Sequence, residues 1–209
     1  MTTVAKDETS GESTIVLQEL KDSEKTTELS LDERMHAQGV PKADVIEDVP
    51  EYLKRKGLEL DAATKEIQEL YGKYKTVENA IQERRSRLLA NLPDFENSLN
   101  YIETAKAAKE KGKTELRMLY KLDENAYQRA KIDDLEKVVL LLGSNTFAEF
   151  TLDEAKELLT SNINGINRVM ELLKEELNWV RDQITTCEVS IAHLYNYGVV
   201  QKKAAQPKA

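Results

Sequence analysis

The stretch INGINRVMELLKEELNWVRDQITTCEVSIAHL, residues 163–194, decides the fold. Its apolar side chains recur at alternating steps of three and four residues, at Ile163, Ile166, Met170, Leu173, Leu177, Val180, Ile184, Cys187, Ile191 and Leu194. This heptad spacing puts them on one stripe of a helix that a second helix must cover, as in a coiled coil. Thr151 and Glu154 have the capping-box spacing, so the sequence predicts a helix over residues 151–197.

A second stripe precedes the first and predicts the partner helix over residues 61–112. Its apolar positions are Ile67, Leu70, Tyr74, Val77, Ile81, Leu88, Leu92, Phe95, Leu99 and Ile102, with Arg84 at one seam position. The step from Leu88 to Leu92 is four residues where three is due, and such a stutter locally unwinds a coiled coil. Pro93 follows at once and lacks a backbone N–H, so we expect a kink there.

Between the helices, over residues 113–150, the apolar period changes from a helical one to alternation. Leu116, Met118, Tyr120 and Leu122 alternate with polar residues, and the turn DEN separates them from AYQRAKI. VVLLL and TFAEF flank the turn GSN in the same way. The sequence therefore predicts two β-hairpins.

The helices can pair only as antiparallel neighbours if the hairpins connect them at one end. Matching the two stripes in reverse order gives a register in which paired residue numbers add to about 262. That register predicts that Arg84, Arg85 and Arg87 lie opposite Glu175 and Glu176.

The remaining segments are less regular. We expect a disordered acidic tail over residues 1–37, because its few apolar side chains cannot offset the entropy of ordering. A semi-ordered lead-in occupies residues 38–60, with two prolines and two glycines. Residues 199–209 read as a basic flexible tail, so the main domain spans residues 38–198.

Composition limits the possible functions. The net charge is −8, which argues against a basic nucleic-acid surface, and no stretch is long and apolar enough to predict a membrane span. One cysteine and two histidines offer neither a disulfide nor a metal cage, and no glycine-rich phosphate loop is present. We therefore expect a cytoplasmic protein that is not an enzyme, with no cofactor and no metal.

The hairpins predict oligomerisation. Isolated hairpins are marginal in water, and their free edges and two-sided apolar strands need cover from other chains. We expect the hairpins of several subunits to assemble into a β-barrel body. The residues assigned to this assembly are Leu116, Met118, Tyr120, Tyr127, Val138, Val139, Leu140, Leu141, Leu142, Phe147 and Phe150.

The order of helix, two hairpins and helix resembles the α-class prefoldin subunits, and within them the subunit 3 group. Three stretches carry the resemblance: GVPKADVIEDV, DENAYQRAKIDDLEKVVLLLGSNTFAEFTLDEAKELL and LNWVRDQITTCEVSIAHLYNY. It covers about residues 38–198 and neither tail.

The resemblance implies a heterohexameric chaperone that uses no nucleotide. One further α-class and four β-class subunits would be its partners, with a double β-barrel body and six coiled-coil arms. Its clients would be unfolded actin and tubulin, captured at the arm tips and passed to the cytosolic group II chaperonin.

The client-binding surface is expected at the open ends of the two helices. Exposed apolar side chains near a frayed coil end can hold extended chains loosely. The candidates are Leu58, Leu60, Ile67, Leu70, Tyr71, Ile191, Leu194, Tyr195 and Tyr197. Ordinary seam packing is the alternative for Ile67, Leu70, Ile191 and Leu194, whereas the three tyrosines lie off the strict seam.

Two other functions fit coiled coils in general. A tether or cytoskeletal scaffold would need no paired hairpins between its helices, and a coiled-coil arm of an enzyme would bind one fixed ligand. The chaperone hypothesis instead predicts binding to many unfolded chains and to none of their native forms.

Overall fold

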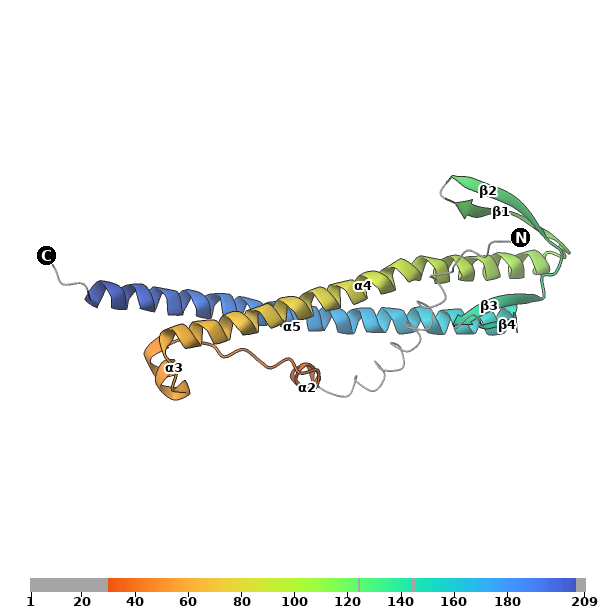
Figure 1. Cartoon of the computed structure of the whole chain (residues 1–209). Coiled ribbons are helices and arrows are strands. Elements are labelled where there is room, and N and C mark those ends of the chain that lie inside the picture. The colour runs from red at the N-terminus through yellow and green to blue at the C-terminus, as the bar shows by residue number, and fades with distance from the viewer. Residues whose placement is uncertain (1–29, 124, 144–145, 206–209) are drawn as a thin grey trace. The chain divides into compact units, whose positions relative to one another are not determined.

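The structure is a computed structural model that describes residues 30–123, 125–143 and 146–205. Its elements are helices α2 (Leu31–Ala37), α3 (Val49–Lys56) and α4 (Leu60–Glu110), strands β1 (Leu116–Asp123), β2 (Ala126–Ile132), β3 (Lys137–Gly143) and β4 (Thr146–Thr151), and helix α5 (Leu152–Ala205) (Figure 1). Two long helices and two antiparallel hairpins thus confirm the predicted fold class. The barrel shared with other subunits stays a prediction.

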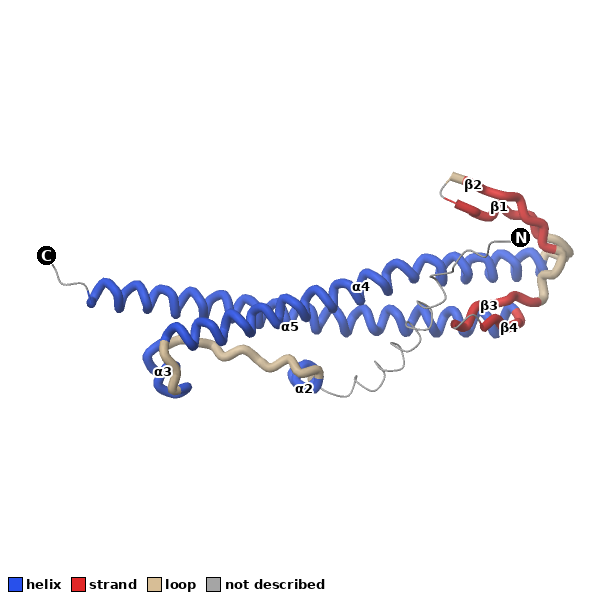
Figure 2. The backbone as a smooth tube through the Cα atoms, viewed as in Figure 1, coloured by secondary structure: helices blue, strands red, loops and turns tan. Residues whose placement is uncertain are grey.

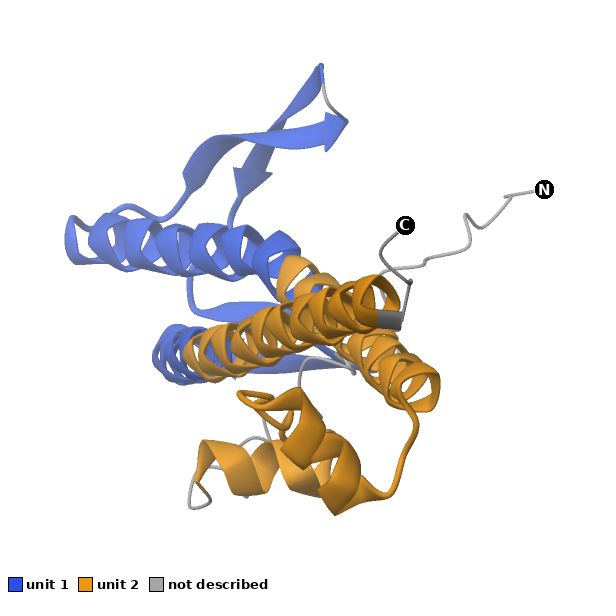
Figure 3. Cartoon of the chain, turned by 90° about the vertical axis from the view of Figure 1, so that its left-hand side faces the viewer, with its two compact units in different colours: residues 1–25, 87–170 blue, residues 26–86, 171–209 orange. Residues whose placement is uncertain are grey.

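The chain divides into two compact units (Figure 3). Residues 87–170 form the hairpin unit, which contains the end of α4, both hairpins and the start of α5. The described residues 30–86 and 171–205 form the lead-in unit, which contains α2, α3, the start of α4 and the end of α5.

Each hairpin is a two-stranded antiparallel sheet (Figure 2). Leu116 pairs with Ile132 at the base of the first, and Lys137 pairs with Thr151 at the base of the second. A register shift precedes each turn, between Lys121 and Asp123 and between Leu141 and Gly143. The predicted turns fall at these hairpin ends and include residues outside the described part.

The hairpin unit has one apolar core. Both helices and the connection between the hairpins supply it, through Ile102, Ala105, Ala108, Leu135, Leu152, Ala155 and Leu159. Small alanines let the antiparallel helices approach closely, and one face of each hairpin packs onto this core. The predicted capping box is present: Glu154 N–H donates to Thr151 Oγ1 (3.3 Å), and Thr151 N–H donates to Glu154 Oε2 (3.0 Å).

The lead-in unit is built around the same two helices. Their seam is buried and contains Ala63, Ile67, Tyr74 and Ile81 of α4 and Leu173, Leu177, Val180, Ile184, Cys187 and Leu194 of α5. Helix α3 begins with the Asp48 cap, which accepts from Glu51 N–H, and ends at Gly57 with φ of 66°, where glycine is favoured.

Some observed boundaries differ from those in the sequence analysis. Helix α2 occupies the end of the stretch predicted to be disordered, because Ser30 and Glu33 cap it and Met35 is buried. Helix α5 runs to Ala205 rather than ending at residue 197. The predicted tails at residues 1–29 and 206–209 lie outside the described residues. Pro93 lies inside α4, and the kink expected there stays a prediction.

Candidate functional site

The outer surface of the hairpins is the first candidate site. Leu116, Met118, Val138, Leu140, Leu141 and Phe150 are partly buried, whereas Tyr120, Tyr127, Val139, Leu142 and Phe147 are exposed. Val139 and Phe147 are 59% and 61% exposed on the outer face of the second hairpin. The structure therefore covers part of each hairpin and leaves other large apolar side chains exposed.

Sequence reasoning left two exposed residues of the first hairpin out of this surface, Leu119 and Leu122. Leu119 is 64% exposed and pairs across the first hairpin with Arg129. Leu119 is one residue out of step with Leu116 and Met118 along the strand. The alternation pattern therefore assigned it to the opposite, polar face. An apolar residue at a polar-parity position was the signal available in the sequence.

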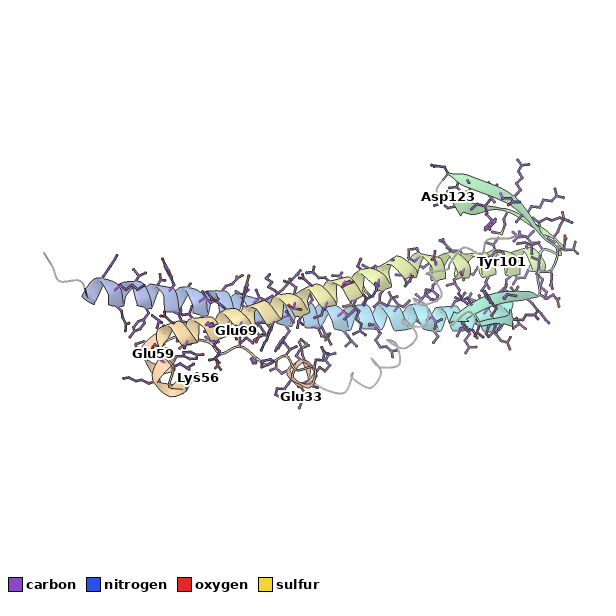
Figure 4. The ribbon with its side chains drawn as sticks, in the orientation of Figure 1. Glu33, Lys56, Glu59, Glu69, Tyr101 and Asp123 are labelled. Carbon is purple, nitrogen blue, oxygen red and sulfur yellow. The ribbon has the colours of Figure 1, made fainter. Side chains whose placement is uncertain are left out.

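Two grooves accompany the exposed strands within the hairpin unit. A groove of about 530 Å³ includes Tyr101, Met118, Ile132 and Val138 in its lining (Figure 4 labels Tyr101). Partial burial there raises the pKa of the Tyr101 phenol. A second groove, of about 350 Å³, is lined largely by leucines of β3 and α5. These open apolar surfaces are typical of a unit completed by other chains.

Ion pairs hold the helices of this unit together around the core. Lys156 bonds Glu103 (3.0 Å), and Lys106 bonds Asp153 and thereby lowers the pKa of that carboxyl. In both pairs the two residue numbers add to about three less than the predicted sum of 262. The observed register therefore differs from the predicted one by less than one helical turn.

The second candidate site is the predicted client-binding surface of the lead-in unit. Ile67 and Leu194 are buried, as ordinary seam packing requires, and Tyr195 is 71% exposed. The other six candidates are partly buried: Leu58, Leu60, Leu70, Tyr71, Ile191 and Tyr197. The Tyr71 hydroxyl donates to Glu188 (3.4 Å). Two exposed residues of α5 were not among the candidates, Val189 and Val200.

The lead-in lies against both helices in this unit. Val40, Ala43, Ile46, Val49 and Tyr52 are buried. Nearer the N-terminus, Arg34 bonds Glu175 (3.0 Å), and Trp179 donates its indole N–H to Asp32 (2.6 Å). The sequence indicated a semi-ordered segment but gave no sign of this attachment, because its partners are more than a hundred residues away.

Backbone atoms at the centre of the lead-in form hydrogen bonds with side chains of both helices. Tyr74 donates its hydroxyl to the Pro41 carbonyl (2.6 Å), and burial raises the pKa of Tyr74 to about 12. Ala43 donates its N–H to Gln183 (2.9 Å), Ser190 bonds the Asp44 carbonyl (3.5 Å), and His193 Nδ1 bonds the Ile46 carbonyl (2.7 Å). A carbonyl only accepts, so His193 carries its proton on Nδ1.

The two glutamates predicted to face the α4 arginines also contact this attachment. Glu175 bonds Arg34 of α2. Burial raises the pKa of Glu176, and the charges of Arg34 and Arg84 oppose that shift. Arg84 therefore lies near Glu176, as the register predicts. Across the same helices Arg181 bonds Glu78 (3.1 Å), and Lys75 and Arg181 together lower the pKa of that carboxyl.

Other chemistry is limited. The thiol of Cys187 is buried in the seam, and burial raises its pKa. Among the described residues no cluster of His, Cys, Asp or Glu could hold a metal ion. No helix in the described part of the chain is apolar enough over a sufficient length to cross a membrane.

Comparisons with known proteins agree with this architecture. A family model described as "Prefoldin subunit" matches residues 74–197. The chain is similar to a probable prefoldin subunit 3 of Caenorhabditis elegans, with 36% identity over 82% of this chain and 92% of the relative. Prefoldin subunit 3 of Homo sapiens is 34% identical over 81% of this chain and 85% of its own length. For that of Drosophila melanogaster the identity is 29%, over 80% and 84%.

Proposed function

The chain belongs to the prefoldin family of chaperone subunits, and from this we propose that it fills the subunit 3 position of a cytoplasmic heterohexamer. One further α-class and four β-class subunits would complete the assembly. It would hold unfolded actin and tubulin without using nucleotide and pass them to the cytosolic group II chaperonin.

The exposed apolar face of the second hairpin carries the proposal. Val139 and Phe147 are large, apolar and exposed on a strand pair whose other face is already covered. Water contact with such a surface is unfavourable by roughly 25 cal/mol per Å², so a closed β-structure with other subunits would stabilise it. A coiled-coil tether has no need for this surface.

Reconstitution with the other five subunits tests the proposal. We expect the assembly to suppress light scattering when denatured actin is diluted from denaturant, without added ATP, and to release bound actin only to the chaperonin. Native actin serves as the control and should not bind. An assembly that binds native filaments but leaves scattering unchanged would instead identify a cytoskeletal scaffold.

A further inference from the structure

The centre of the lead-in is held by hydrogen bonds to its backbone and by three buried side chains. Residues 40–46 contain neither helix nor strand and run along α4 and α5 within the lead-in unit (Figure 2). Four helix side chains bond the backbone of this segment: Tyr74, Gln183, Ser190 and His193. We name the surface formed by these four side chains the lead-in groove.

The groove residues of α5 follow the order of the segment that they bond. Gln183 and Ser190 are seven residues apart, or about two helical turns, so they lie on one face of α5. They bond the backbone at Ala43 and Asp44, while Tyr74 and His193 bond carbonyls on either side. The groove thus bonds consecutive parts of one backbone.

Side-chain selection by the groove is confined to three positions. Val40, Ala43 and Ile46 are buried at every third position, whereas Lys42, Asp44 and Val45 are exposed. Main-chain hydrogen bonds give affinity in peptide recognition, and pockets for a few side chains set specificity. A groove of this kind would accept many sequences that carry small or branched apolar residues at that spacing.

The lead-in also covers residues that sequence analysis assigned to client binding. Ile67 and Leu70 of α4 line a cavity of about 280 Å³ together with Pro41, Ala43 and Asp44. Lys56 and Glu69 stand at the same cavity (Figure 4). Two predicted client residues therefore face a segment of the chain's own lead-in.

We propose that the lead-in groove is a binding site for an extended apolar segment of an unfolded polypeptide, and that residues 40–46 are its built-in, displaceable occupant. This inference rests on the proposed chaperone function. The lead-in has the advantage of being tethered, which gives it a high effective concentration at the groove. A client segment can bind only after the lead-in leaves, so the closed arm holds polypeptide weakly.

Displacing the lead-in without touching the groove tests this inference. The probe is a fluorescent synthetic peptide of residues 39–49, GVPKADVIEDV. Ile46→Asp in the full-length chain puts a charge at a side chain that is 2% exposed. We expect this variant to bind the peptide at least about tenfold more tightly than the unaltered chain, as measured by fluorescence anisotropy.

Two further measurements show that the lead-in has left and that the helices remain. Trp179 is the only tryptophan and lines one cavity with Val40 and Lys42, so its emission should shift to longer wavelength on release. Far-UV circular dichroism should keep its helical signal. Where Ile46→Asp fails to fold, Ala43→Pro offers a second variant, because it removes the N–H that donates to Gln183 and introduces no charge.

Backbone recognition has its own test with the released variant. Methylating the peptide nitrogen at the Ala43 position should weaken binding about tenfold, since it removes a hydrogen bond and leaves Gln183 unsatisfied. Replacing the exposed Lys42 and Val45 side chains by serine should change the affinity by no more than about threefold.

Equal peptide binding by the unaltered chain and a released variant would overturn the inference. Equal affinity of the released variant for the methylated and the unmethylated peptide would overturn it as well. These readouts need no other subunit, so they are independent of the assembled chaperone. Suppression of actin aggregation without peptide binding would leave the proposed function standing and remove this inference. Peptide binding without suppression would contradict the proposed chaperone function and leave only a peptide-binding groove.

Discussion

Tyr74 combines two roles at the residue scale. Its ring fills a fully buried position of the coiled-coil seam, and its hydroxyl donates to the Pro41 carbonyl of the lead-in. The heptad pattern predicts the first role. The second depends on a backbone carbonyl 33 residues earlier in the chain, which no periodicity can indicate.

Tyr74→Phe should reverse the order of stability between neutral and strongly alkaline pH. Near pH 8 the variant loses one hydrogen bond and should be less stable by about 1 kcal/mol. The pKa of Tyr74 is raised to about 12. The stability linked to its proton is therefore fully present below the unfolded value of about 10 and is lost as pH rises through about 12, by about 3 kcal/mol.

Urea unfolding followed by circular dichroism measures this at both pH values. Tyr195→Phe is the control. The Tyr195 side chain is 71% exposed, so loss of its hydroxyl should leave the free energy of unfolding unchanged. A Tyr74→Phe variant that stays less stable than the unaltered chain at pH 12 would show that Tyr74 is not protected from ionisation.

Individual residues also show where sequence reasoning stops. Cys187 and Leu194 are buried because they continue a stripe that can be read directly. Leu119 and Arg34 were not assigned, since one breaks the alternation of its strand and the other finds Glu175 far along the chain. The spacing of apolar residues predicts which face of a helix or strand is buried. The contacts of irregular segments depend on tertiary structure and have no such pattern.

At the scale of elements, pairing between α4 and α5 fixes which charges meet. Arg181 bonds Glu78, which also accepts from Lys75 of its own helix. The Glu78 residue is only 8% exposed, so this contact is better shielded than a typical surface pair. It is the best place to test the observed register.

Exchanging the two charges should recover stability that each single reversal loses. We expect Arg181→Glu and Glu78→Arg each to lower the free energy of unfolding, and the double variant to regain about 1 kcal/mol through their coupling. Lys75 stays next to the new arginine, so recovery should be partial. Thermal unfolding of the four proteins gives the coupling energy.

Glu69→Arg provides the comparison for that cycle. Glu69 is exposed and pairs with Lys65 on its own helix, so combining its reversal with Arg181→Glu should give additive losses. Additive losses in the Glu78 cycle as well would contradict the register.

The hairpins have a different requirement, because large apolar side chains on their outer face are exposed in this chain. Val139→Asp with Phe147→Asp should therefore leave the helicity and melting temperature of the isolated chain almost unchanged. Burying two carboxylates against other subunits would be strongly unfavourable, so co-purification with those subunits should be lost.

Thr146→Asp is the matched control in the second hairpin, since Thr146 is an exposed polar residue next to Phe147. Size-exclusion chromatography of the mixed subunits should show assembly for Thr146→Asp and free chain for the double variant. Assembly by both would mean that the outer face of this hairpin is not an interface.

For the whole molecule, the two units have separate expected tasks. The hairpin unit carries the apolar strands assigned to assembly, and the lead-in unit carries the residues assigned to client binding. Heptads and alternation predict both sets of elements, whereas the docked lead-in lies outside either pattern. Client-binding residues are harder to predict than assembly residues, because an apolar residue near the helix ends can instead pack in the coiled-coil seam, as the buried Ile67 and Leu194 do.

Tyr195 is the most exposed of the client-binding candidates, so it gives the most direct test in the assembled chaperone. A photo-reactive phenylalanine analogue in its place should cross-link denatured actin, since an exposed ring can contact an extended chain. The same analogue at Leu89 is the control: Leu89 is 47% exposed but lies in the hairpin unit. Cross-linking reports contacts of this subunit alone, so the arms of other subunits cannot mask the result. Equal labelling of both positions would mean that actin is held without preference for the lead-in unit.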